Sequence, residues 1–462
     1  MTRNVLAALT LSIAAASLAR ALPAQADTAH AVAPEAAKPD SQPPKPDPFS
    51  FASWAWLTGN SRDTTPVIHT QYFDLEFRAD INFVEDLNHP QDHTLDGSAE
   101  MGRTSEIQLQ QLGIGGDFHY KQVRARLMTQ FGMYSQLTPR NDASPGRGQW
   151  DLANAYRYIS EAYGGYHWNS MYGINLDAGI FMSYIGLYSY YNFDNWSYQP
   201  SYVSANTPWF FEGLRLQTFP SERFKAEFWL INGWQSYGMF NHQPGVGFEL
   251  LWRPNANLSL VTNDYYGHDA LNTPGRYRIH TDNSIQWKYF DTPKNFLTRG
   301  AMSFTFDLGC ESGGGVTCSG GPGGPAQNFL GFMAYDRLWI AHDLFAFTVG
   351  GGAITNPGRY LVLLPPINGA TAFSGTPYYT ENPGDSYKAW DLSLTFDYMP
   401  DDHITFRSEV NHRESNLPYF VGPGGVTPVG GNQGVPGSIV PNFNPDLVKT
   451  ETRFNFAVLV KL

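Results

Sequence analysis

The feature that most constrains this chain is a strict alternation of apolar and polar residues, which recurs in long segments. Between Phe73 and Phe83 every odd position is apolar and every even position is polar, over eleven residues. A period of two is typical of a β-strand with one apolar face and one polar face. The last segment, 447–462, alternates in the same way. The chain is therefore predicted to be an all-β protein.

The predicted strands are long and evenly punctuated. Strands of soluble proteins average about 5 to 6 residues, whereas a tilted strand that crosses a bilayer needs about 9 to 11. The connections between the predicted strands of this chain alternate between short and long without exception. This is typical of a transmembrane, antiparallel, up-and-down β-barrel with short periplasmic turns and long external loops. The sixteen predicted strands are 69–84, 104–116, 120–135, 154–166, 171–186, 209–219, 223–235, 245–253, 257–267, 276–290, 296–309, 327–340, 343–355, 388–399, 402–413 and 447–462.

The placement of charge supports lipid as the outer solvent. An arginine or lysine that faces lipid at mid-bilayer costs about 2 to 4 kcal/mol, so the charges of a spanning strand are expected on one face. Arg124 and Arg126 share one face of their strand, and Arg407 and Glu409 share one face of theirs. Glu212 is an exception and is expected at the rim of the barrel.

Composition excludes several other classes of protein. The 31 Phe, 26 Tyr and 12 Trp argue against disorder. Only 16% of the residues are charged, against about 25% in an ordinary soluble domain. After the first 26 residues there is no uninterrupted apolar stretch near the ~20 residues of a transmembrane helix. A net charge of −12 makes nucleic acid a poor partner.

The N-terminus predicts export. Residues 1–26 combine Arg3, an apolar core and an Ala24-Gln25-Ala26 cleavage site, the layout of a bacterial signal peptide. Its removal deletes two arginines and no acidic residue, which leaves the mature chain at −14. Residues 27–48 are predicted to be a Pro/Ala-rich periplasmic lead-in. The aromatic segment 49–68 is expected either to seal the periplasmic mouth or to plug the lumen, and the barrel is assigned to 69–462.

Short motifs between residues 172 and 254 resemble those of a known family. They are Asp177 to Phe181, Ile185-Gly186, Gly213 to Arg215, Ile231 to Trp234 and Arg253-Pro254. The chain resembles the β-barrel porin 2 (OmpL-like) family of bacterial outer-membrane proteins. Two departures are Leu187, where a charged residue is expected, and the C-terminal Leu462, where an aromatic residue is common.

The resemblance implies a porin of the bacterial outer membrane. We expect a water-filled channel for the passive diffusion of small hydrophilic solutes, since sixteen strands enclose an aqueous lumen. Expected partners are outer-membrane lipid, the solutes and the barrel-assembly machinery during insertion, with a homo-oligomer left open. Two alternatives are a structural or adhesive barrel with a blocked lumen and an outer-membrane lipid hydrolase. No catalytic signature accompanies the outward-facing His412, so no enzyme, cofactor or metal is expected.

One external loop and a set of charges are the candidates for lining the pore. By topology the loop 187–208 corresponds to the loop that narrows general porins. Its candidate constriction residues are Tyr190, Asp194, Asn195 and Trp196; the alternative is a loop packed over the mouth. The charged residues either create a field across the lumen or brace the wall through ion pairs. The predicted pore-lining residues are Asp74, Glu76, Arg78, Asp80, Arg124, Arg126, Arg157, Glu161, Asp177, Arg407, Glu409, Glu451 and Arg453.

The only two cysteines, Cys310 and Cys318, lie in one Gly-rich external loop. The oxidising compartment and the flexible spacer favour a disulfide that staples this loop. The alternative is a pair of free thiols.

Overall fold

The computed structural model describes the barrel and most of its connections. The described residues are 45–54, 57, 66–95, 97, 98, 100–139, 142, 144, 148–270, 273–322, 324, 326–358, 360, 386–429 and 440–462. The predicted signal peptide and residues 27–44 of the predicted lead-in lie outside this set. Pro46–Leu462 form one compact unit.

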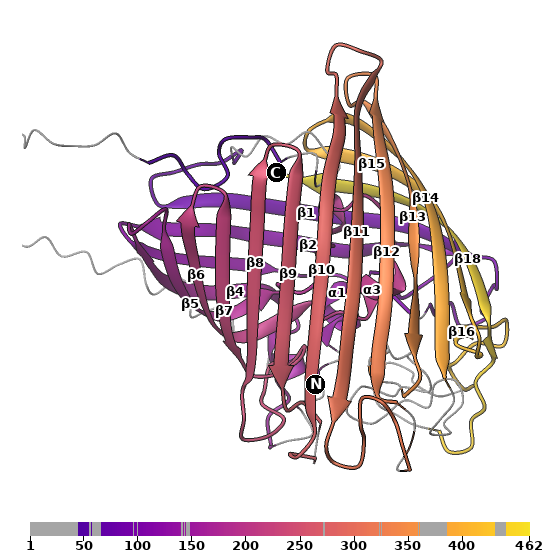
Figure 1. Cartoon of the computed structure of the whole chain (residues 1–462). Coiled ribbons are helices and arrows are strands. Elements are labelled where there is room, and N and C mark those ends of the chain that lie inside the picture. The colour runs from indigo at the N-terminus through magenta and orange to yellow at the C-terminus, as the bar shows by residue number, and fades with distance from the viewer. Residues whose placement is uncertain are drawn as a thin grey trace, which may run out of the picture. The chain divides into compact units, whose positions relative to one another are not determined.

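Sixteen strands of the described residues form a closed ring, which confirms the predicted barrel (Figure 1). The strands are β1 (Phe73–Asp86), β2 (Glu106–Tyr120), β3 (Val123–Thr129), β4 (Ile159–Trp168), β5 (Ile174–Met182), β6 (Phe210–Ser221), β7 (Phe224–Ile231), β8 (Gly245–Asn255), β9 (Leu258–Gly267), β10 (Tyr277–Asp291), β11 (Leu297–Ser312), β12 (Asn328–Ile340), β13 (Phe345–Asn356), β14 (Tyr387–Asp401), β15 (Ile404–Ser415) and β18 (Thr450–Lys461). Neighbours in the chain are neighbours in the ring.

The ring closes between its first and last strands. β1 pairs antiparallel with β18, which places Ile81 opposite Val458. β18 also pairs with β15, because the two-residue strands β16 (Phe420–Val421) and β17 (Leu447–Val448) pair with each other outside the ring. A closed ring leaves no unpaired strand edge, as a membrane interior requires.

The wall turns polar side chains inward and apolar side chains outward. On β14 the inward Asp391, Ser393 and Asp397 are 4%, 1% and 0% exposed, whereas the outward Leu392 and Leu394 are 52% and 57% exposed. A water-soluble protein shows the opposite preference, because it covers large apolar patches and seldom buries charged residues. The observed distribution fits a barrel whose outer face is solvated by lipid.

Short helices replace the external ends of two predicted strands. The strand predicted at 120–135 ends at Thr129 and leads into α1 (Tyr134–Leu137). The segment predicted as strand 154–166 begins within α2 (Leu152–Tyr156). Aromatic rings of both helices pack against neighbouring loops, and this tertiary packing overrides the local strand pattern. No helix in the described part of the chain is long and apolar enough to cross a membrane.

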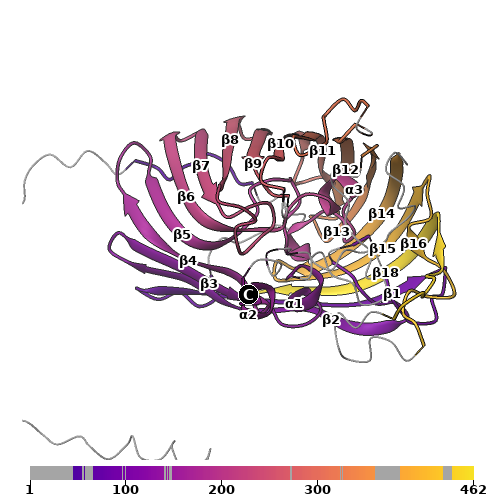
Figure 2. The same cartoon turned by 90° about the horizontal axis from the view of Figure 1, so that it is seen from below.

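The connection between β5 and β6 contains two further short helices, η4 (Asn192–Asp194) and α3 (Tyr202–Ala205). Figure 2 views the barrel from one end and shows α3 inside the ring of strands, beside β12 and β13. The barrel interior is therefore partly filled by its own chain.

The aromatic segment that precedes the barrel packs against short turns. The Phe49 N–H donates to the Glu222 carbonyl at 2.7 Å. The Arg253 guanidinium lies over the rings of Phe49 and Trp54, 4.8 and 4.3 Å from their centres. Cation–π contacts of this kind contribute about 0.5 to 2 kcal/mol each. The described part of the segment is thus fixed at the turns β6–β7 and β8–β9.

Candidate channel constriction

Residues 183–209, which join β5 to β6, run inside the barrel and are named the inward loop. Every residue from Tyr190 to Trp209 except Asp194 is buried. Burial raises the pKa of Tyr188, Tyr190 and Tyr198 above the usual value. A tyrosine hydroxyl is protonated at neutral pH even at its ordinary pKa of about 10, so all three can donate hydrogen bonds.

Two buried arginines of the wall hold the carbonyl groups of the inward loop. Arg407 donates to the carbonyls of Asn192, Asn195 and Ser197 at 3.1, 2.6 and 3.0 Å. Arg337 donates to the carbonyl of Trp196 at 3.2 Å. Hydrogen bonds from an ionised donor are stronger than neutral ones, so the path of the loop is closely specified here.

One carboxylate balances both arginines. Asp397 accepts from Arg337 at 2.7 Å and from Arg407 at 2.8 and 3.0 Å. All three side chains are 0% exposed. A buried ion group of this kind is stable only while every partner is present.

Three other carboxylates receive donors from the inward loop. Glu409 accepts from the N–H groups of Tyr198 and Gln199 at 2.6 and 2.8 Å. Asp80 accepts from the Tyr198 hydroxyl at 2.8 Å. Asp391 accepts from the Tyr202 N–H at 2.9 Å. The loop is therefore held from β1, β12, β14 and β15.

Apolar packing also holds the inward loop against the wall. Phe193 and Tyr198 pack against Val84, Ala457 and Leu459, which are apolar residues on inward positions of β1 and β18. The cluster also contains Leu95 and Met101 from the first external loop.

Two glycines let α3 approach the wall. A Cβ at Gly331 would lie 2.8 Å from Val203 Cγ2, and one at Gly352 would lie 2.5 Å from Ser201 Oγ. Only the folded structure shows that the missing side chains make room for a loop from the other half of the barrel.

A second charged cluster lies on β1 to β4. Arg126 is surrounded by Asp117, Glu76 and Glu161, at 2.7, 2.9 and 3.0 Å. Arg78 contacts Glu76, and it pairs with Asp194 of the inward loop at 3.1 Å. These side chains are less completely buried than the anchors on β12 to β15, with Glu76 at 15% and Arg126 at 11% exposed.

The remaining predicted pore-lining residues also form pairs. Asp177 contacts Arg215 at 2.8 Å and Arg124 at 3.4 Å, and Arg453 contacts Glu451 at 2.7 Å.

Two predicted residues stand apart. Asp74 bonds to His69 near the start of the barrel. Arg157 lies after α2, outside any strand, with its guanidinium over the Tyr158 ring. All the predicted pore-lining residues except Arg157 occupy inward faces of strands, Asp74 at the start of β1 included. Contact of solutes with these residues stays a prediction.

The constriction candidates divide into two groups. Tyr190 donates to Gln130 at 2.6 Å and packs against Tyr134, which turns it towards β3 and α1. Asp194, Asn195 and Trp196 instead line a cavity together with Leu187 and Tyr188. Sequence reasoning placed all four candidates in one constriction.

The cavity has a volume of about 370 Å³ and lies between the inward loop and the inward faces of β8 to β11. It is named the luminal gap. The wall contributes the apolar Leu251 and Val261 and the polar Glu249, Arg253, Ser259, Asn263, Gln286 and Ser303. Leu57 of the N-terminal segment also reaches the gap. Sequence reasoning missed this wall because its polar residues are mostly uncharged.

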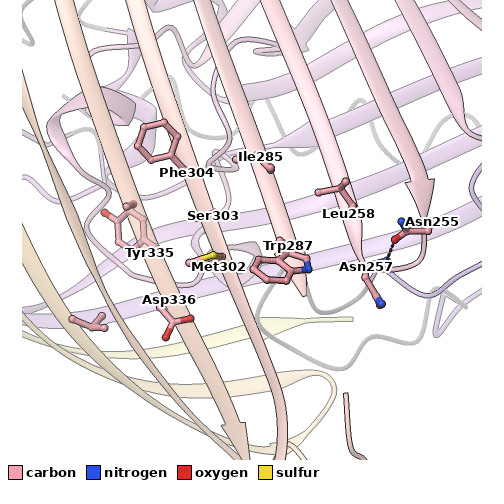
Figure 3. Close-up of a pocket in the computed structure, with 12 residues that line it drawn as sticks. Asn255, Asn257, Leu258, Ile285, Trp287, Met302, Ser303, Phe304, Tyr335 and Asp336 are labelled. Atoms are coloured by element: carbon pink, nitrogen blue, oxygen red, sulfur yellow. Dashed lines mark hydrogen bonds between the residues drawn. The ribbon is translucent and has the colours of Figure 1, made fainter. Parts of the chain in front are cut away.

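A larger depression of about 710 Å³ lies elsewhere, on β9 to β13. Its side chains include the outward Trp287, Met302 and Phe304, which are 48%, 43% and 44% exposed. Figure 3 shows these residues spread across adjacent strands. This depression is apolar and faces the lipid side, so it does not belong to the lumen.

Cys310 and Cys318 are joined by a disulfide in the structure. The bond joins Cys310, near the end of β11, to Cys318 in the connection between β11 and β12. Ser312 contacts the Cys318 sulfur at 3.3 Å.

A closed barrel with a lipid-facing surface, a polar lumen and an inward loop defines an outer-membrane porin. The chain belongs to the family described as "Putative beta-barrel porin-2, OmpL-like", whose model matches residues 78–435. This confirms the predicted family and the outer-membrane location. A comparison with curated proteins gives no match.

Several solved structures of outer-membrane proteins are similar to this chain. OmpT of Vibrio cholerae, expressed in the outer membrane, is 8% identical; the match covers 86% of this chain and 99% of OmpT, with a TM-score of 0.50. The channel DcaP of Acinetobacter baumannii is 11% identical over 86% of this chain and 100% of its own, with a TM-score of 0.47. The anion-selective porin from Comamonas acidovorans is 10% identical over 84% and 99%, with a TM-score of 0.48.

Proposed function

We propose that small hydrophilic solutes diffuse passively through this porin along the luminal gap. The observation that carries the proposal is the position of the gap, which separates residues 186–196 of the inward loop from β8 to β11, although Tyr184 at the start of the loop bonds to the Asp264 carbonyl of β9. The loop is fastened to β1 and to β12 through β15, whereas the gap separates it from β8 to β11.

Thiol modification tests this route. Ser303→Cys places a thiol in the gap, and Ser393→Cys places one on a residue of β14 that is 1% exposed and does not line the gap. Both changes replace a hydroxyl by a thiol of similar size. A cationic methanethiosulfonate reagent is expected to lower the current of Ser303→Cys channels in planar bilayers, because the added group occupies the route.

Ser393→Cys is the matched control and is expected to keep its current. Equal block of both variants would place the route elsewhere in the lumen. The complete absence of current from the wild-type protein would favour the alternative of a structural or adhesive barrel with a blocked lumen.

We propose no catalytic role. The surroundings of His412 support a rim position, since its Nδ1 contacts the Thr452 hydroxyl at 2.8 Å and its ring packs on Trp390. A lipid hydrolase would release fatty acid from vesicles that contain the purified protein. No release above that of empty vesicles is expected.

A second copy of this chain is proposed as a partner. Thr262 and Asp264 on β9 lie opposite Asn283 and Thr281 on β10, on the outward face of the barrel. A polar patch in this position is costly against lipid, and the same patch on a second subunit would offer donors and acceptors. Cross-linking in native membranes through Thr281→Cys is expected to give a dimer band, because one thiol per chain joins two chains, whereas Val349→Cys on β13 is expected to give none.

A further inference from the structure

The polar side chains that line the luminal gap are mostly uncharged. Asn195 contributes from the inward loop, and Ser259, Asn263, Gln286 and Ser303 contribute from the wall. Hydroxyl and amide groups each supply donors and acceptors at the same place. Such a lining can form hydrogen bonds with a solute whose own groups are both donors and acceptors.

The charged residues of the gap are held by other groups of the protein. Glu249 pairs with Lys225 at 2.6 Å, and Asp194 pairs with Arg78 at 3.1 Å. The Arg253 guanidinium is stacked on the rings of Phe49 and Trp54. Each of the two carboxylates is therefore paired with a cation that it shares with a second carboxylate, and the arginine is covered by aromatic faces.

Several uncharged groups of the gap keep unused hydrogen-bonding capacity. Asn263 donates to Asp282 at 3.2 Å, which leaves its buried Oδ1 without a partner among the described residues. Among the residues that the structure describes, the side chains of Gln286 and Ser303 make no hydrogen bond. A buried acceptor without a partner costs about 1 to 3 kcal/mol, so a solute that supplies a donor gains affinity.

Aromatic rings form the opposite side of the gap. Tyr188 and Trp196 of the inward loop line it together with Tyr184. The hydroxyls of Tyr184 and Tyr188 are occupied by the Asp264 carbonyl and by Ser197, at 2.9 and 3.0 Å. These residues consequently offer ring surface to a ligand, which suits a molecule with apolar C–H faces.

We infer that the luminal gap is a binding site for one neutral, polyhydroxylated solute of the size of a sugar ring. Vicinal hydroxyls match the amides of Asn263 and Gln286, and the C–H faces of the ring match the aromatic side. The volume of about 370 Å³ lies at the lower end of the ~300 to 1,000 Å³ of small-molecule sites. The inference rests on the proposed diffusion route and names the class of solute that the route selects.

Current block by sugars tests the site. Purified full-length protein is inserted into planar bilayers, and glucose, gluconate and glucosamine are added in turn. Glucose is expected to reduce the ion current in a saturable manner. Gln286→Leu is expected to raise the half-blocking concentration of glucose about tenfold, the effect of one to two lost hydrogen bonds.

Gln108→Leu is the matched control, because β2 lies opposite β10 in the ring and Gln108 does not line the gap. Its half-blocking concentration for glucose is expected to equal that of the wild type. Equal sensitivity of Gln286→Leu and wild type would overturn the inference. Stronger block by gluconate or glucosamine than by glucose would overturn it as well, in favour of a charged solute.

The two proposals fail in different ways. A channel that conducts ions and ignores all three sugars refutes the sugar site and leaves the diffusion channel standing. If no current flows at all, the diffusion channel fails, and saturation-transfer NMR on glucose with the protein in detergent decides the site. Transfer that is lost in Gln286→Leu supports the site, and no transfer to wild type refutes it.

Discussion

At the scale of single residues, the charged side chains of this lumen mainly hold the inward loop against the barrel wall. Asp397, Arg407 and Arg337 form one buried group, and their remaining hydrogen bonds hold the inward loop. Solvation by water is replaced here by backbone carbonyls. Such a group is sensitive to the loss of any one member, because the other charges are then left buried without compensation.

Replacement of Asp397 tests this dependence. Asp397→Asn leaves two guanidinium groups without their shared carboxylate, so we expect a loss of about 3 to 5 kcal/mol in the free energy of unfolding. Chymotrypsin is expected to cut within residues 183–209, which the wild type protects. Urea unfolding in detergent and mass spectrometry of the fragments measure the two effects.

The control is Asp117→Asn, in a pair with Arg126 at 2.7 Å whose aspartate is 51% exposed. Exposed pairs contribute about 0 to 1 kcal/mol. Similar losses from both substitutions would contradict the role assigned to the buried group.

At the scale of elements, parity explains how much of this structure could be predicted. The alternation predicted sixteen strands, because the alternating pattern of each strand depends only on the residues of that strand. It also assigned the inward face of Asp80, Arg407 and Glu409 correctly. Their partners could not be read from parity, because they come from a loop that is distant in sequence: Arg407 bonds to the Asn192 carbonyl across 215 positions.

Irregular segments were the least predictable elements. Helix α2 and the shortened β3 arise from packing between loops, which outweighs the local pattern. Ala457 and Leu459 break the inward polar pattern of β18 because Phe193 packs on them. The uncharged wall of the luminal gap gave no signal, since serine, asparagine and glutamine occur on the inward face of many barrel strands.

Asp142 makes one contact between external loops dependent on pH. It accepts from the Ser144 hydroxyl at 2.7 Å and from the Ser236 hydroxyl at 3.2 Å. Burial raises the pKa of Asp142 above its ordinary value of 3.8. The folded state therefore binds the proton more tightly than the unfolded state, so stability is greatest below that ordinary pKa and falls as pH rises through the raised pKa.

Hydrogen exchange at Ser144 and Ser236 measures this effect. After correction for base catalysis, protection in the wild type is expected to decrease as the pH rises from about 4. Asp142→Asn remains neutral throughout and is expected to lose the dependence. A wild-type protection factor that does not change with pH would contradict the prediction.

At the scale of the whole molecule, the barrel is narrowed from two directions. The inward loop enters from the external side, and Leu57 reaches the luminal gap from the segment that packs on the short turns. We predict that deletion of residues 27–57 raises the single-channel conductance, because it removes Leu57 and uncovers Arg253. Deletion of residues 27–44 alone keeps these contacts and is expected to leave the conductance unchanged.

The chain order of the anchors has a consequence for assembly. Three of the four strands that hold the inward loop, β12, β14 and β15, are made after it, since Arg337 and Arg407 follow their loop partners by 141 and 215 residues. Contacts of such separation form late during folding. A nascent barrel that stalls before β12 therefore retains an unlocked loop. The loop can dock only after these strands have joined the barrel wall. Protection of residues 183–209 from protease therefore indicates that insertion of the barrel is complete.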